Sequence, residues 1–119
     1  MVTWILWALI LAMLAWMGFN YLRIRRAAKI VDNEEFEALI RTGQLIDLRD
    51  PAEFHRKHIL GARNIPSSQL KTSLAALRKE KPVLLYENQR AQRVTNAALY
   101  LKKQGFSEIY ILSYGLDSW

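Results

Sequence analysis

The clearest pattern in the chain is a short apolar run, residues 82–86, followed by a polar segment and then by a long amphipathic stretch. The run begins with proline and has no helical period, as is typical of a strand covered on both faces. From Val94 onward apolar residues recur at helical spacing, and Gly105 supplies a left-handed stop. Glu87 to Arg93 are therefore predicted to form a loop between the end of a buried strand and the start of a helix.

A capping box marks the start of an earlier helix. Asp32 is followed three residues later by Glu35, the spacing at which the two side chains can satisfy the first amides of a helix. This helix is expected to end at Gly43. Its buried stripe is formed by Phe36, Leu39 and Ile40.

A second, shorter helix is predicted after Asp50. Asp50 and Pro51 indicate an N-cap followed by proline at the first helical position, with Glu53 as the side chain that reaches back. The helix is expected to run through Lys57, and further helical turns carry Leu70, Leu74 and Leu77.

Short strands are predicted between these helices, at residues 44–48, 62–65 and 108–112. Because strands alternate with helices, the expected fold class is α/β, a parallel sheet flanked by helices on both faces. In such a sheet ligands bind at the carboxyl ends of the strands, where backbone amides and a helix dipole converge on an anion. The loop of residues 87–93 lies at this position.

The N-terminal segment of the chain, residues 1–22, carries no charge. As a helix rising about 1.5 Å per residue it is long enough to cross a bilayer core of about 30 Å. The first basic residues come after it, which by the positive-inside rule places the rest of the chain in the cytoplasm and the N-terminus outside. A cleaved signal peptide is the alternative, but signal peptides carry positive charge before a shorter apolar run. We expect a single-pass protein of the cell membrane.

Charge is distributed unevenly along the chain. The formal net charge is +6, and four of the 17 basic residues, Arg23, Arg25, Arg26 and Lys29, precede the first acid. We expect residues 23–30 to be a basic juxtamembrane linker and residues 31–119 to form one nearly neutral domain. Since no basic patch with interleaved aromatic residues is present, no nucleic-acid partner is predicted.

The sequence contains no cysteine. Disulfides, thiolate nucleophiles and thiolate metal sites are therefore excluded within these residues. Asp47 and Glu87 could form a carboxylate pair, but two carboxylates without a third ligand do not make a metal site. We predict neither a metal nor a cofactor.

Three segments together resemble the rhodanese-like domain family. They are LIDLRDPAEFHRKHILGARNIP at residues 45–66, the strand, loop and helix at residues 82–106, and IYILSYGLDSW at residues 109–119. The resemblance implies a rhodanese-like fold with a cysteine after the central strand, in a loop whose amides cradle a persulfide or an oxyanion. In this chain Glu87 occupies that place, or Asn88 if the loop is aligned one residue later, and Arg93 lies near an arginine that closes the family's loop.

Neither alignment supplies a nucleophile. A thiolate can accept sulfane sulfur because it is strongly nucleophilic, whereas a carboxylate cannot store a persulfide. The Glu87 carboxylate would instead occupy the positive field at the start of the helix, so we expect oxyanions to bind weakly or not at all. A simpler role for Glu87 is to pair with a neighbouring arginine and to cap the helix.

The candidate site is the loop together with the end of the neighbouring strand. Asp47 and Arg49 at this strand end either face the loop or form a local salt bridge and turn cap. His58 is a candidate general base, but a hydrogen-bonded turn histidine is the simpler interpretation. The candidate binding residues are Glu87, Asn88, Gln89, Arg90, Ala91, Gln92, Arg93, Asp47 and Arg49.

The preferred functional interpretation is a membrane-anchored, catalytically inactive domain that acts as a cytoplasmic binding or regulatory module, with a protein partner at the loop. The first alternative is an enzyme, either a sulfurtransferase that uses a thiol from a partner or a hydrolase that uses Glu87. The second is a structural subunit of a membrane complex, in which the membrane helix carries the specificity.

Overall fold

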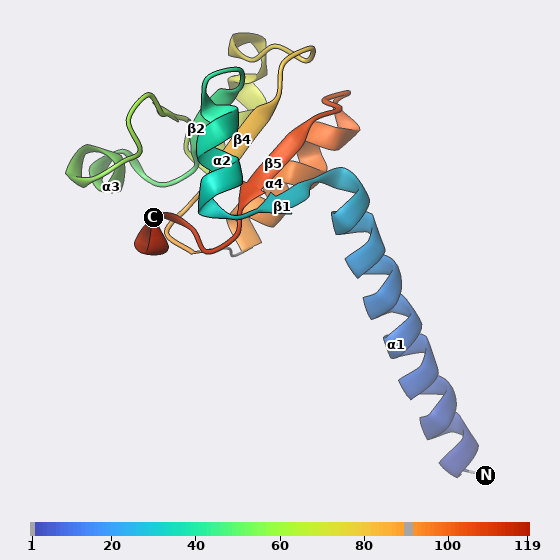
Figure 1. Ribbon diagram of the computed structural model, residues 1–119. Helices are drawn as coiled ribbons and strands as arrows, with labels where there is room; N and C mark the ends of the chain where they lie inside the picture. The colour runs from blue at the N-terminus through green and yellow to red at the C-terminus, as the bar shows by residue number, and fades with distance from the viewer. Residues whose placement is uncertain (1, 90–91) are drawn as a thin grey trace.

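The computed structural model describes residues 2–89 and 92–119. Helix α1 (Val2–Ala27) projects away from a small α/β domain, as Figure 1 shows. Its segment Val2–Leu22 has a mean hydropathy of 2.0 and is not buried by any other part of the described chain, so it is long and apolar enough to cross a membrane. The domain follows α1 almost at once, with only Ala28 before the first strand.

Residues 23–30, expected as a basic juxtamembrane linker, have regular secondary structure on both sides of Ala28. The backbone stays helical through Ala27, and strand β1 (Lys29–Val31) begins two residues later. The sequence analysis missed β1 because three residues, one of them lysine, carry no strand periodicity.

The sheet has five strands in the order β1-β5-β4-β2-β3, and all pairs are parallel. The four predicted strands are confirmed, each slightly shorter than expected, and β4 lies in the middle of the sheet. Their bounds are β2 (Gln44–Asp47), β3 (Arg63–Asn64), β4 (Val83–Tyr86) and β5 (Ile109–Leu112).

Helices cover both faces of the sheet, as expected. The α-helices of the domain are α2 (Asn33–Ile40), α3 (Pro51–Arg56) and α4 (Gln92–Lys103). The turns that carry the predicted leucines are 3₁₀ helices, η1 (Ser67–Thr72) and η2 (Leu74–Ala76), and a third, η3 (Leu116–Ser118), ends the chain.

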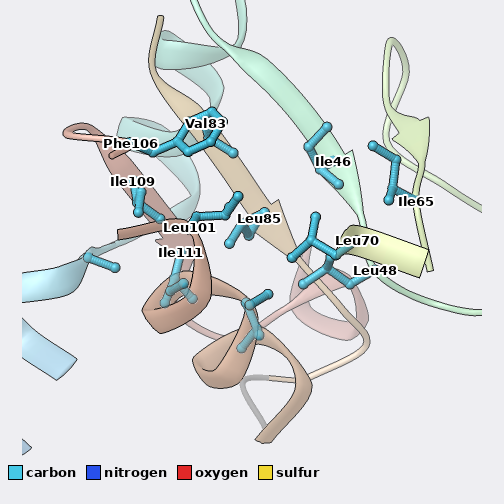
Figure 2. Close-up of a cluster of buried hydrophobic side chains, with 14 of the residues drawn as sticks. Ile46, Leu48, Ile65, Leu70, Val83, Leu85, Leu101, Phe106, Ile109 and Ile111 are labelled. Atoms are coloured by element: carbon cyan, nitrogen blue, oxygen red, sulfur yellow. The ribbon is translucent and has the colours of Figure 1, made fainter. Parts of the chain in front are cut away.

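Alternate residues of β4 enter two separate cores. Val83 and Leu85 pack with α4 and η1 in the core that Figure 2 shows. Leu84 and Tyr86 point to the opposite face, where Phe36 of α2 meets the Tyr86 ring edge-on at a centroid distance of 6.5 Å. The strand is buried on both faces, which explains its continuous apolar sequence.

One of the two predicted capping boxes forms in part. The Asp32 side chain accepts a hydrogen bond from the Glu35 backbone N–H at 2.9 Å, as expected. Asp50 and Pro51 do begin α3, but Asp50 makes no side-chain cap and Glu53 does not reach back to it. Glu53 instead bonds to Asn88 in the candidate loop. Sequence spacing could not distinguish these two partners.

The two glycines that were expected to end helices have different roles. Gly105 has a φ of 100° and closes α4 with paired bonds, from Phe106 N–H to the Leu101 carbonyl and from Gly105 N–H to the Lys102 carbonyl, each 3.1 Å. Gly43 does not have a positive φ, which corrects the expected helix stop. It is needed for space, because a Cβ there would lie 2.1 Å from Leu84 Cδ1.

Candidate functional site

Glu87 is the first residue after β4, and its side chain turns back onto the start of α4. The Val94 backbone N–H donates to Glu87 Oε2 at 2.8 Å, and the Glu87 side chain is buried. A carboxylate therefore occupies the positive end of α4 and bonds to an amide of its first turn. The capping role expected for Glu87 is present. Arg90, the neighbouring arginine, lies outside the described residues, as does Ala91.

Asn88 is held on both ends of its side-chain amide. Arg49 Nη1 donates to Asn88 Oδ1 at 2.9 Å, and Asn88 Nδ2 donates to Glu53 Oε2 at 2.7 Å. The Asn88 carbonyl accepts the backbone N–H of Asp117 at 3.0 Å. Asn88 thus links the ends of two strands with α3 and with the C-terminal segment.

Asp47 and Arg49 fulfil both roles that the sequence left open. Arg49 Nη2 lies 2.8 Å from Asp47 Oδ2, and the Arg49 backbone N–H donates to Asp47 Oδ1 at 2.9 Å, which is the expected salt bridge and turn cap. The same guanidinium faces the loop through Asn88 and also donates to the Lys57 carbonyl. Exposure is 0% for Asp47 and 4% for Arg49.

The pair is stabilised by direct hydrogen bonds in a dry environment. Burial lowers the pKa of Arg49, but the hydrogen bond and the charge of Asp47 outweigh it and raise the pKa above its ordinary value. Arg49 is therefore a permanent cation whose charge is balanced within the fold and not offered to solvent.

Tyr86 lies beneath this cluster at the end of β4. Its hydroxyl accepts the Ile59 backbone N–H at 3.1 Å, and the Arg49 guanidinium carbon lies 5.9 Å from its ring centroid. Burial raises the pKa of Tyr86 well above its ordinary value, so the phenol stays protonated.

The other described residues of the predicted loop face solvent. Gln89, Gln92 and Arg93 are exposed, and Gln92 Nε2 donates to Asn96 Oδ1 at 2.8 Å. Arg93, expected near a loop-closing position, lines a groove between α4 and η1. The exposed surface of the described loop is thus formed by amides and one cation.

Sequence analysis missed the part played by the C-terminal segment. The Leu116 backbone N–H donates to the Glu87 carbonyl at 2.8 Å, beside the bond from Asp117 to Asn88. Gly115 makes this approach possible, since a Cβ there would lie 2.3 Å from the Asn88 carbonyl oxygen. The only local signal of this contact in the sequence is Gly115 itself.

His58 has a structural role. Its Nδ1 lies 2.7 Å from the Phe54 carbonyl oxygen, and its ring stacks on the Phe54 ring at 3.9 Å. These contacts hold the turn after α3 and agree with the simpler interpretation of this histidine.

The chemistry that this site can perform follows from its side chains. No cysteine is present in the sequence, and a carboxylate occupies the helix start where an oxyanion would bind. Among the described residues no cluster of three metal-ligating side chains occurs. The sequence therefore supplies no thiol at this site that could carry sulfur.

Comparisons with known proteins agree with this fold. Residues 32–119 match the family model described as "Rhodanese-like domain". The chain is 46% identical over 108 residues to the uncharacterized protein YqhL of Bacillus subtilis (strain 168), covering 91% of this chain and 85% of the relative. It is 35% identical over 94 residues to the thiosulfate sulfurtransferase GlpE of Stutzerimonas stutzeri (strain A1501), covering 76% of this chain and 84% of that protein.

Solved structures show the same architecture. A rhodanese-related protein from Thermoplasma volcanium superposes with a TM-score of 0.69 at 23% identity, covering 76% of this chain and 89% of that one. A human single-domain sulfurtransferase gives a TM-score of 0.68 at 23% identity, covering 77% and 95%. With the family model matching most of its length, this chain belongs to the rhodanese-like domain family.

Proposed function

We propose that this protein is a membrane-anchored, catalytically inactive rhodanese-like domain that acts as a binding or regulatory module on the cytoplasmic side of the cell membrane. The protein partner binds at the loop that follows β4. The observation that carries the proposal is the bond from Val94 N–H to the Glu87 carboxylate, because it places a fixed anion where a catalytic loop would hold a negatively charged sulfur or oxygen group.

The bonding around the loop favours recognition over turnover. Glu87 and Asn88 are tied to β2, α3 and η3 through Arg49, Glu53 and the backbone of residues 116 and 117. A surface held in this way loses little conformational entropy when a partner binds.

The alternative is a sulfurtransferase that borrows a thiol from a partner. The name of the relative GlpE favours this class of activity, since that protein is called a thiosulfate sulfurtransferase. The sequence argues against it, because a chain without cysteine cannot form a persulfide on itself.

An activity assay separates these two functions. The full chain in mild detergent is incubated with thiosulfate and cyanide, with and without glutathione as the borrowed thiol, and thiocyanate is measured. The GlpE relative serves as the positive control. We expect no thiocyanate above the protein-free rate; formation that depends on the protein, in either condition, would overturn the proposal of inactivity.

A crosslinking experiment tests the binding role. A photo-crosslinking residue replaces Gln89, which is exposed on the loop, and in a matched variant replaces Glu37, which is exposed on α2. We expect a discrete protein adduct in native membranes from position 89 and none from position 37. Identical adduct patterns, or adducts with lipid alone, would contradict a protein partner at the loop.

The proposed anchor is Val2–Leu22, supported by its length, its apolar composition and the basic residues behind it. Mass spectrometry of the protein from membranes should find the N-terminal segment intact, and alkaline carbonate should not extract it. Protease added to intact cells should leave the domain uncut. A mature chain that begins after residue 22 would identify a signal sequence instead.

A further inference from the structure

A second candidate site lies beside α4 and shares only Gln92 and Arg93 with the predicted loop. It is a groove of about 330 Å³ between η1 and α4, hereafter the η1–α4 groove. Neither Glu87 nor Asn88 lines it. The volume falls within the range of pockets for small ligands, about 300–1,000 Å³.

The floor of the η1–α4 groove is apolar and fixed by the core. Leu70 and Ala97 line the groove and are almost fully buried, and the partly buried Tyr100 packs against the same core. Figure 2 shows Leu70 entering this core from η1 beside β4 and α4. A ligand that fills such a floor needs an aromatic or hydrocarbon part.

The rim of the groove is cationic. Lys71 and Arg93 line it, and no acidic residue does. Lys71 Nζ lies 5.6 Å from the Tyr100 ring centroid, so the ammonium is held over the apolar floor. Arg93 makes no ion pair within the described residues, which leaves its guanidinium available to a ligand.

Hydroxyl donors complete the rim. Ser67 and Ser68 line the groove, and neither side chain makes a hydrogen bond in the described part of the chain. A guanidinium, an ammonium and serine hydroxyls together are the donors that proteins use for phosphate oxygens.

We propose that the η1–α4 groove binds an organic phosphate, with the phosphate between Lys71 and Arg93 and the apolar part against Leu70, Ala97 and Tyr100. A soluble phosphate ester and the head group of an anionic phospholipid offer the same chemistry. A lipid is included as a source because α4 also contacts α1, which leads away from the domain as Figure 1 shows. The proposal does not depend on the inactivity of the loop.

The test uses the full chain in nanodiscs of phosphatidylcholine, with phenyl phosphate as the soluble probe and amide chemical shifts as the readout. We expect saturable shifts at Leu70, Ala97 and Tyr100, and weaker binding of inorganic phosphate, which lacks the apolar part. In a second arm, nanodiscs that contain phosphatidic acid should shift the same amides without phenyl phosphate if a lipid is the source.

A double variant, Lys71→Gln with Arg93→Gln, should weaken phenyl phosphate binding about tenfold or more, because both charge-assisted contacts are lost. Lys103→Gln, an exposed charge on α4 that does not line the groove, is the matched control and should bind like the native chain.

The inference is wrong if neither arm gives saturable shifts, if the double variant binds like the control, or if shifts appear only at Asn88 and Val94. Shifts at Asn88 and Val94 would also contradict the proposal that the loop rejects oxyanions. The other two outcomes would overturn the groove as a binding site and leave the proposal for the loop intact.

Discussion

The Glu87 carboxylate lies 2.8 Å from the Val94 backbone nitrogen and caps α4 from seven residues upstream. Val94 is 1% exposed, so its amide loses its hydrogen-bond acceptor at a buried position if the carboxylate is removed. Glu87→Ala should therefore lower the free energy of unfolding by about 1–3 kcal/mol. Urea unfolding of the full chain in mild detergent measures this loss.

Glu37→Ala, at an exposed position of α2, is the control and should stay within about 0.5 kcal/mol of the native chain. Equal stability of the two variants would show that the cap adds nothing.

The same contact predicts how the loop responds to oxyanions. In the native chain the Glu87 carboxylate repels an anion and occupies the Val94 amide. Sulfate and thiosulfate should therefore give no saturable shift at the Val94 amide, whereas Glu87→Ala should allow one. Binding of sulfate at Val94 in the native chain would contradict this account.

Arg49 should be the most sensitive charged residue of the site. Arg49→Ala leaves the fully buried Asp47 carboxylate without its cation, which should cost about 3–5 kcal/mol of unfolding free energy. Arg49→Lys keeps the charge but loses the planar group that joins Asp47, Asn88 and Lys57, so its loss should be smaller. Both losses are read from urea unfolding.

Arg78→Ala provides the comparison for Arg49, because the Arg78 side chain is 68% exposed. It should change the unfolding free energy by less than about 0.5 kcal/mol. A comparable loss at Arg49 and Arg78 would refute the importance of the buried pair.

The raised pKa of Tyr86 predicts that the folded protein becomes less stable at alkaline pH. Its pKa is raised in the folded state, so above about pH 10, the pKa of an unfolded tyrosine, the unfolded chain binds fewer protons than the native one. Stability should fall as the pH rises above that value, by up to about 1.4 kcal/mol per pH unit. Unfolding free energies measured between pH 8 and pH 11 test this.

Tyr86→Phe removes the titrating group. It should be less stable at neutral pH, because the Ile59 amide loses its acceptor, but its stability should fall less steeply above pH 10. The assignment to Tyr86 fails if the native chain and this variant show the same slope.

A comparison of Gly115 with Gly61 tests whether the backbone of Gly115 lies in close contact with Asn88. Both have a positive φ, 74° and 91°, but a Cβ at Gly115 would meet the Asn88 carbonyl at 2.3 Å whereas at Gly61 it would meet nothing within 4 Å. Gly61→Ala should cost about 1 kcal/mol and Gly115→Ala about 3 kcal/mol or more. Thermal or urea unfolding should rank them in this order, and the reverse order would exclude a tight contact at Asn88.

Patterns within short stretches predicted much of this structure. A continuous apolar run predicted β4, the helical period predicted α4, and the absence of charge predicted α1. The predicted loop from Glu87 to Arg93 was too long at its end, because α4 already begins at Gln92. These features depend on neighbours a few residues apart, which a single sequence displays.

Contacts between distant residues could not be predicted in this way. Glu53 was expected to cap its own helix, but it bonds to Asn88, 35 residues away. The backbone amide of Asp50 and the side-chain amide of Asn88 can each satisfy the Glu53 carboxylate. Only the packing of α3 against the loop decides between them. The same holds for the C-terminal segment, whose amides bond to the carbonyls of Glu87 and Asn88.

The junction between α1 and β1 has a mechanical consequence. A single buried residue, Ala28, separates the long helix from an edge strand of the sheet. If α1 spans a bilayer as proposed, a change in its tilt or rotation, caused by membrane thickness or by another helix, would also rotate the sheet. The orientation of the domain would then depend on the orientation of α1.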